Sequence, residues 1–282
     1  MSTDTAKFFQ TEHIDEIFEK GQVILHSVPL PLELELSIVD ACTRKCFCCP
    51  RGDETLAPNT SLKMIPHLYN KLADELKVLG YKGLIMLSGF GECLLHPDIC
   101  DVVKAFNFTY VDMNTNGDLL TRIKIQQLID AGINQIMVSV YEKEGMQKFA
   151  EMSKGYEDHV ILRNRYENFD RLFNNRGGSV KGAHDKGTGS GVTGEGLCYY
   201  PFYLLGIDAN GDVYPCCHEW QRRLKMGNLY QHTMWEIWNS PSIKKVRRKI
   251  IEGKRDIFPC KQCNVDGTYR GGNNFALRSK LL

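Results

Sequence analysis

Short apolar runs alternate with helical patterns along the first 176 residues, and this alternation limits the possible folds more than any other feature. The segment PLELELSIVD at 31–40 alternates apolar and polar residues with a period of two, which predicts a strand. Further apolar runs lie at 83–87, 110–114, 135–140 and 159–163. Helical patterns lie near 11–20, 65–78, 97–106, 120–131, 145–154 and 167–174. Because such repetition needs parallel crossovers, it predicts an α/β sheet or barrel of about six strand–helix units.

The composition changes after residue 176. Residues 177–196 contain eight glycines and no apolar run, which indicates a flexible boundary or a lid. Apolar runs at 203–208 and 212–214 flank an Asn-Gly pair, which predicts a hairpin, and a helix is expected at 232–252. We therefore expect a catalytic domain at 1–176, a glycine-rich linker or lid at 177–196, and a small metal-stabilised module at 197–282.

Charge and hydropathy narrow the environment of the chain. The net charge is +1, so no overall field draws the chain to nucleic acid or to an anionic membrane. The basic run at 244–249 is interpreted as a solvated helix face. No apolar stretch approaches the roughly 20 residues of a membrane span, and the N-terminus lacks the pattern of a signal peptide. We expect a cytoplasmic protein, in which eleven cysteines at short spacings indicate metal binding and not disulfides.

The first cysteine cluster directly follows the first predicted strand. The segment CTRKCFCCP places Cys42, Cys46 and Cys49 in a loop at the carboxyl end of that strand, where α/β barrels carry their chemistry. Three thiolates can hold one side of an iron–sulfur cubane and leave one iron free. The alternatives are a zinc site, which prefers paired CxxC units and four protein ligands, or buried thiols.

This spacing resembles the CxxxCxxC signature of the radical S-adenosylmethionine (radical SAM) superfamily. The resemblance implies a [4Fe–4S] cluster whose open iron binds SAM, and cleavage of SAM to a 5′-deoxyadenosyl radical that abstracts a substrate hydrogen. It also implies a partial (β/α)6 TIM-like barrel. Three positions depart from the family pattern. Cys48 replaces an aromatic residue and is expected beside the cluster but not as a ligand, Cys93 replaces a frequent proline, and Tyr141 stands where many relatives have Asp.

Two later motifs resemble segments of the same family. LSGFGE at 87–92 resembles its GGE motif, in which Gly89 and Gly91 would let the backbone approach the cofactor and Glu92 would bind the SAM amino group. NTNG at 114–117 resembles the segment that meets the ribose hydroxyls. The alternative in each case is a plain loop or turn.

The remaining cofactor-binding candidates of this resemblance are polar residues in or after the predicted strands. They are Asn114, Asn116, Ser139, Arg163 and Arg165. Ser139 matches a position that often bonds the SAM carboxylate. The two arginines could neutralise a carboxylate, although surface arginines are the alternative.

A second cysteine set lies beyond the glycine-rich segment. It consists of Cys198, Cys216, Cys260 and Cys263. Four thiolates suit either zinc or an iron–sulfur cluster. The pattern resembles the twitch module, a shortened SPASM extension, which implies one auxiliary [4Fe–4S] cluster. Cys217 is interpreted as a structural thiol, with a hydrogen-atom donor or an alternative ligand as the other reading.

The two resemblances together suggest a function. An auxiliary cluster with four protein ligands cannot bind SAM, but it could accept an electron from a substrate radical. The cysteine spacing and the chain length resemble twitch-type dehydrogenases that oxidise an amino-cyclitol, the 2-deoxy-scyllo-inosamine dehydrogenase type. We expect a radical SAM oxidoreductase that oxidises a secondary alcohol of a sugar or cyclitol, reduced by flavodoxin or ferredoxin. Glu142, Glu144 and the arginines are candidate proton acceptors.

Three other functions stay open at the level of sequence. The chain could be a radical epimerase acting on a similar substrate, with a thiol such as Cys217 returning a hydrogen atom. It could modify a ribosomally made peptide. It could also be a non-enzymatic zinc or redox-sensing protein.

Overall fold

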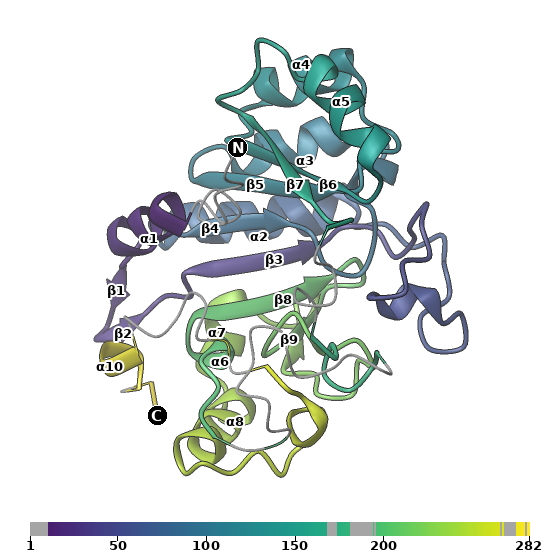
Figure 1. Ribbon diagram of the computed structural model, residues 1–282. Helices are drawn as coiled ribbons and strands as arrows, with labels where there is room; N and C mark the ends of the chain where they lie inside the picture. The colour runs from purple at the N-terminus through teal and green to yellow at the C-terminus, as the bar shows by residue number, and fades with distance from the viewer. Residues whose placement is uncertain are drawn as a thin grey trace.

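A single mixed sheet forms the centre of the molecule (Figure 1). The computed structural model describes residues 11–167, 174–180, 194, 196–265, 267, 275–279 and 281–282, with side chains from residue 16 onward. Within these residues the strands of the sheet follow the order β10-β9-β8-β3-β4-β5-β6-β7. Their bounds are β3 Glu33–Ser37, β4 Leu84–Leu87, β5 Tyr110–Thr115, β6 Gln135–Val140, β7 Val160–Asn164, β8 Leu204–Asp208, β9 Asp212–Tyr214 and β10 Gly227–Asn228. A separate two-stranded ribbon pairs β1 Ile24–Leu25 with β2 Val28–Pro29.

The central strand β3 joins the two halves of the chain. It pairs in parallel with β4 on one edge and with β8 on the other, so that Glu33 lies opposite both Leu84 and Leu204. In the described residues, β3 to β7 supply five parallel strands before residue 176, and the sixth, β8, comes from the C-terminal segment. The sheet therefore continues across the expected domain boundary, and the division at 177–196 stays a prediction.

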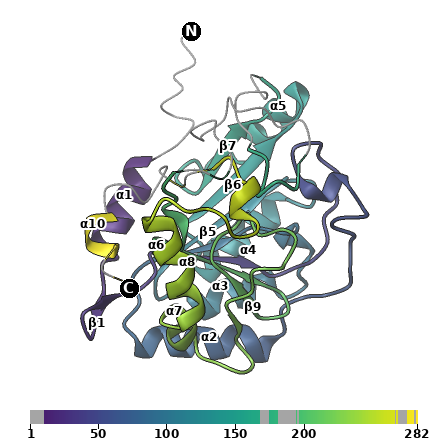
Figure 2. The same ribbon diagram turned by 90° about the horizontal axis from the view of Figure 1, so that it is seen from below.

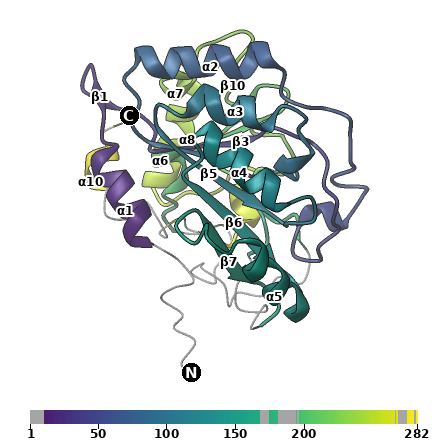
Figure 3. The ribbon, with the colours of Figure 1, turned by 90° about the horizontal axis from the view of Figure 1, so that it is seen from above.

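Helices cover the outer face of the parallel strands. Their bounds are α1 Thr11–Lys20, α2 Pro66–Val78, α3 Ile99–Phe106, α4 Arg122–Ala131, α5 Lys143–Met152, α6 Tyr200–Tyr203, α7 Met234–Trp238, α8 Pro241–Ile251 and α10 Phe275–Arg278. Figure 3 shows α2, α3 and α4 side by side along the sheet, and α5 packs on β6 and β7. The helix expected at 167–174 falls mainly outside the described residues. No helix in the described part of the chain is long and apolar enough to cross a membrane.

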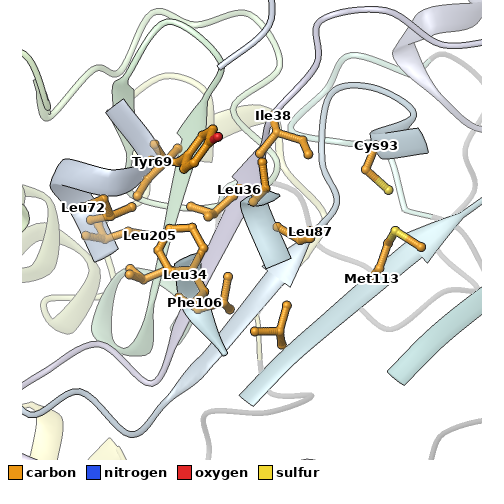
Figure 4. Close-up of a cluster of buried hydrophobic side chains, with 14 of the residues drawn as sticks. Leu34, Leu36, Ile38, Tyr69, Leu72, Leu87, Cys93, Phe106, Met113 and Leu205 are labelled. Atoms are coloured by element: carbon orange, nitrogen blue, oxygen red, sulfur yellow. The ribbon is translucent and has the colours of Figure 1, made fainter. Parts of the chain in front are cut away.

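The alternation in β3 assigns its two faces. Leu34 and Leu36 are fully buried against the helices, in a cluster that includes Leu72 and Phe106 (Figure 4). Each such leucine contributes about 2 kcal/mol through removal of apolar surface from water. The polar residues between them point to the opposite face of the strand. That face is the inside of the barrel, where the candidate site lies.

The helix expected at 232–252 is two helices. Ser240 ends the connection between α7 and α8, and its hydroxyl accepts a hydrogen bond from the N–H of Ile243. Pro241 occupies the first turn of α8, where its missing N–H costs nothing, whereas inside a continuous helix it would remove a hydrogen bond. Thr233 starts α7 with a reciprocal capping box to Glu236.

Charged side chains hold the C-terminal helices in place. The Glu75 carboxylate of α2 accepts hydrogen bonds from the N–H groups of Met234 and Trp235 at the start of α7, and Figure 2 shows the two helices side by side. Arg247, within the basic run at 244–249, is fully buried and lies over the Trp238 ring at 3.9 Å. The interpretation of this run as a solvated face is therefore wrong at Arg247, because its guanidinium bonds buried backbone carbonyls.

Candidate functional site

The three cysteines of the CxxxCxxC motif line one cavity of about 320 Å³ inside the barrel. The loop that carries Cys42, Cys46 and Cys49 leaves the carboxyl end of β3. Burial, together with the charges of Cys48, Cys49 and Cys42, raises the pKa of the Cys46 thiol to about 11. These sulfurs are therefore close enough for their charges to interact. Metal binding is what would deprotonate such a group of thiols.

Hydrogen bonds fix this cysteine loop to the turn after β5. The Arg44 guanidinium binds both carboxylate oxygens of Asp118 at 2.6–3.0 Å, and the Thr43 hydroxyl bonds the same carboxylate at 3.0 Å. The Cys42 sulfur accepts hydrogen bonds from the Arg44 N–H at 3.4 Å and from the Asn116 side chain at 3.6 Å. N–H donors directed at a sulfur favour its thiolate form. The residues present therefore fit a cluster held by thiolates.

The glycine-rich turn after β4 passes too close to β3 for any side chain. A Cβ at Gly89 would lie 1.9 Å from the Ser37 hydroxyl, and φ there is +102°. A Cβ at Gly91 would lie 2.2 Å from the Val39 carbonyl oxygen. The close approach is what brings Glu92 under the cysteine loop, where its N–H bonds the Ala41 carbonyl at 2.8 Å.

Glu92 is a buried carboxylate with several donors. Its Oε1 accepts from the Thr115 hydroxyl at 2.8 Å and the Leu94 N–H at 3.0 Å, and its Oε2 accepts from the Asn116 N–H at 2.9 Å. Burial raises the pKa of Glu92, and these hydrogen bonds oppose that rise. The predicted contact of Glu92 with a SAM amino group stays a prediction.

All eight cofactor-binding residues predicted from sequence line this cavity. They are Gly89, Gly91, Glu92, Asn114, Asn116, Ser139, Arg163 and Arg165. Within the cavity, the Arg163 guanidinium donates to the Ser139 hydroxyl at 2.7 Å, and the Asn114 side chain donates to Ser88 at 3.3 Å. The structure thus brings together side chains from four neighbouring strands, although their individual roles stay predictions.

The second cysteine set also lies together, behind the cavity. Burial raises the pKa of the Cys216 thiol well above its usual value, and the nearby thiols of Cys217, Cys260, Cys263 and Cys198 raise it further. Burial likewise raises the pKa of Cys198 and of Cys260 to about 12. Four cysteines separated by up to 65 positions in the sequence, from 198 to 263, are therefore neighbours in space.

Hydrogen-bond donors also reach a sulfur atom of the second cysteine set. The Cys263 sulfur accepts hydrogen bonds from the N–H groups of Val265 and Gly177 and from the Arg255 guanidinium, which oppose the rise in its pKa that burial causes. In the described residues no three or more His, Cys, Asp or Glu side chains are grouped around a point that would hold a single metal ion. A cubane cluster spreads its ligands further apart than one ion does, and the donor set fits such a cluster.

Sequence reasoning missed several residues of the cavity. Glu33 and Glu35 line it, because they occupy the inner face of β3, and so do Arg176 and His218. The period-two pattern of the first strand carried the signal for the two glutamates. Burial together with the nearby Arg176 guanidinium lowers the pKa of His218 to about 3, which keeps its imidazole neutral.

Two proton-acceptor candidates do not reach the cavity. Glu142 is an exposed side chain that pairs with Arg44 at 3.6 Å, outside the cavity lining. Glu144 lies exposed in the first turn of α5. Both glutamates follow the carboxyl end of β6, and Glu142 lines a second pocket together with Cys46 and Tyr141, so their role as proton acceptors stays a prediction.

Comparison with known proteins agrees with this architecture. The SPASM family, described as an iron–sulfur cluster-binding domain, matches residues 198–264, which contain all four cysteines of the second set. The predicted resemblance to radical SAM oxidoreductases that use SAM and iron–sulfur clusters, with a C-terminal auxiliary-cluster module, is confirmed.

Particular relatives match most of the chain. The S-adenosyl-L-methionine-dependent 2-deoxy-scyllo-inosamine dehydrogenase of Niallia circulans is 25% identical over 239 residues, which cover 82% of this chain and 92% of that protein. The structure of BtrN in complex with AdoMet and 2-DOIA superposes with a TM-score of 0.73 at 24% identity, covering 84% and 94% of the two chains. BtrN in an open conformation gives a TM-score of 0.63 at 22% identity, covering 86% of this chain and 97% of that chain. The predicted α/β fold with a partial barrel is confirmed by these likenesses.

Proposed function

We propose that this protein is a radical SAM dehydrogenase that oxidises a secondary alcohol of a small cyclitol or sugar-like substrate. One observation carries the proposal. Cys217 lines the cavity, and its chain neighbour Cys216 belongs to the second thiol set. The site for hydrogen abstraction and a site that could take up an electron therefore share one wall.

The bound cofactors supply the chemistry in this proposal. When bound, SAM and the first cluster would supply a 5′-deoxyadenosyl radical able to take a hydrogen atom from the carbinol carbon, and the auxiliary cluster would be the acceptor for the electron released as the hydroxyl loses its proton. The products are a carbonyl compound, 5′-deoxyadenosine and methionine. One external electron starts the reaction, and we propose flavodoxin or ferredoxin as its donor in a reducing cytoplasm.

The chain's own residues bind and orient the reactants. Cys42, Cys46 and Cys49 would hold the first cluster, and the Arg44–Asp118 pair fixes the loop that carries them. Glu92, held by Thr115 and Asn116, is a buried carboxylate at the cavity wall, where charge-assisted hydrogen bonds are strong. The second cysteine set would hold the auxiliary cluster.

The likeness to the Niallia circulans dehydrogenase supports an aminocyclitol as the first substrate to test. Anaerobically reconstituted protein is mixed with SAM, a reductant and 2-deoxy-scyllo-inosamine, and both 5′-deoxyadenosine and carbonyl product are measured. We expect the two in equal amounts. A colourless zinc protein that releases no 5′-deoxyadenosine would contradict the proposal.

Radical epimerisation is the second candidate, and the position of Cys217 favours it. Its thiol lines the cavity and could return a hydrogen atom to a substrate radical, while the auxiliary cluster would re-reduce the resulting sulfur radical with uptake of a proton. In D₂O, epimerisation places solvent deuterium on a product carbon, whereas oxidation gives an unlabelled carbonyl. Cys217→Ala should abolish epimerisation and spare oxidation.

A further inference from the structure

His218 is a buried histidine whose ring makes no hydrogen bond to the described residues. Its side chain is 3% exposed and lines the cavity, with its ring edge-on to Tyr200 at a centroid distance of 5.2 Å. In the described chain neither Nδ1 nor Nε2 has a partner, although both are buried. Leaving polar atoms buried without partners is costly, and the described residues do not supply the partner that this ring needs.

A second histidine shows that this fold can satisfy a buried imidazole. His96 is also 3% exposed. Its Nε2 lies 2.9 Å from the Met64 carbonyl oxygen, and its Nδ1 accepts the Asp98 N–H at 3.1 Å. Burial alone therefore does not explain why the His218 ring makes no hydrogen bond to the described residues.

Arg176 lies beside His218 at the same wall of the cavity. Its Nε is buried without a hydrogen-bond partner in the described chain, and its backbone has φ +49°, a left-handed conformation that is unfavourable for arginine. The neighbouring Asn175 holds this conformation, because its side chain bonds the Gln262 carbonyl at 2.6 Å and its N–H bonds Asn264 at 3.0 Å. Strain maintained by the surrounding structure is typical of functional sites.

The two backbone segments that carry these residues touch each other. A Cβ at Gly177 would lie 2.6 Å from the His218 carbonyl oxygen. Gly177 also donates its N–H to the Cys263 sulfur. Arg176 and His218 are therefore positioned as one unit, between the cavity and the second cysteine set.

We propose that His218 and Arg176 form the substrate-binding wall of the cavity and select a ring with neighbouring oxygen substituents. This inference rests on the proposed function and specifies its substrate contacts. The two ring nitrogens of a histidine can donate and accept hydrogen bonds, which suits a hydroxyl group, whereas a guanidinium only donates and suits an oxygen acceptor. The residues predicted to bind SAM lie in or just after β4 to β7, whereas His218 follows β9, and we assign this part of the cavity wall to the substrate.

The first test needs no substrate. Replacing His218 with Phe or Leu removes the unsatisfied nitrogens, so the thermal midpoint of the cluster-loaded protein without substrate should rise by about 2–5 °C. The same replacements at His96 should lower it, because they break two existing hydrogen bonds. A fall in midpoint for both His218 variants would overturn the proposal.

The second test uses 2-deoxy-scyllo-inosamine as the probe. His218→Phe and Arg176→Gln should each raise KM about tenfold or more, with a smaller change in kcat. His218→Asn should recover part of the loss. An unchanged KM in both variants would overturn the assignment. If the wild type does not turn over the probe, the proposed substrate fails, and the thermal midpoints still decide the role of His218.

A spectroscopic control tests whether His218 binds the substrate or instead interacts with the auxiliary cluster. The electron paramagnetic resonance signal of the reduced auxiliary cluster should be the same in the wild type and in His218→Phe. A shifted signal would assign the imidazole to the cluster and overturn the proposal.

Discussion

Arg222 of the C-terminal segment donates to both carboxylate oxygens of Asp40, at 2.5 and 3.2 Å. Asp40 lies just beyond β3, before the cysteine loop, and also pairs with the buried Arg51, which follows the loop. The Arg222 guanidinium in turn lies over the Phe90 ring at 5.0 Å. One carboxylate therefore connects the cysteine loop to the module that carries the second cysteine set.

Asp40→Asn should lower the free energy of unfolding by about 3 kcal/mol or more, because it leaves the buried Arg51 charge uncompensated. Anaerobic denaturant unfolding measures this. Asp74→Asn is the matched control, because it breaks an exposed pair with Lys77 and should cost less than about 1 kcal/mol. If both variants lowered the free energy of unfolding equally, the ion pairs of Asp40 would stabilise the fold no more than an exposed pair does.

Gly89→Ala should reduce SAM cleavage about a hundredfold, since the turn must shift away from β3 and move Glu92 with it. Gly80→Ala is the control, because φ at Gly80 is also positive, at +64°, but no atom lies within 4 Å of the added Cβ. That variant should lose about 1 kcal/mol of stability and keep its activity. Full activity in Gly89→Ala would show that the close approach is not needed.

Cys46→Ala should lose about four of the roughly eight irons of the reconstituted protein, whereas Cys48→Ala should keep them. Cys48 lines the same cavity, so proximity alone does not distinguish the two thiols. Iron analysis and the visible spectrum measure the result. Iron loss in Cys48→Ala with retention in Cys46→Ala would reverse the predicted ligand set.

Asp118→Asn should speed the loss of iron to a chelator, because it weakens the bidentate bond that fixes Arg44 and the cysteine loop. The control Asp130→Asn alters an exposed carboxylate of α4 that bonds only Gln126 among the hydrogen bonds described. If the two variants release iron at the same rate, the Arg44–Asp118 pair does not hold the loop.

Local sequence patterns predicted most of the strands and helices of the fold. The strands at β6 and β8–β9 follow from apolar runs and an Asn-Gly turn, and β3 from its alternation. The prediction of a single helix at 232–252 was wrong. It gave more weight to helical periodicity than to Ser240-Pro241, a pair that signals the start of a new helix. The pairing of β8 with β3 joins segments far apart in the sequence, and no local pattern encodes it.

The candidate site likewise contains some features that local sequence patterns reveal and others that they do not. Cysteine spacing and the glycine–glutamate turn are local, so they could be found from sequence, and the structure brings them to one cavity. The presence of Glu35 in the cavity wall, in contrast, depends on which face of β3 points into the barrel. His218 and Arg176 stand out because the described residues leave polar atoms of their side chains without hydrogen-bond partners, which a sequence does not reveal.

The central claim is that three thiolates hold a cluster with one iron open to SAM. Electron paramagnetic resonance of the reduced protein, with and without SAM, tests it most directly, using Cys260→Ala to weaken the auxiliary signal. We predict that SAM shifts the signal of the remaining cluster, and that Cys42→Ala abolishes this shift. A signal that does not respond to SAM in the wild type would show that no iron is open, and would contradict the account.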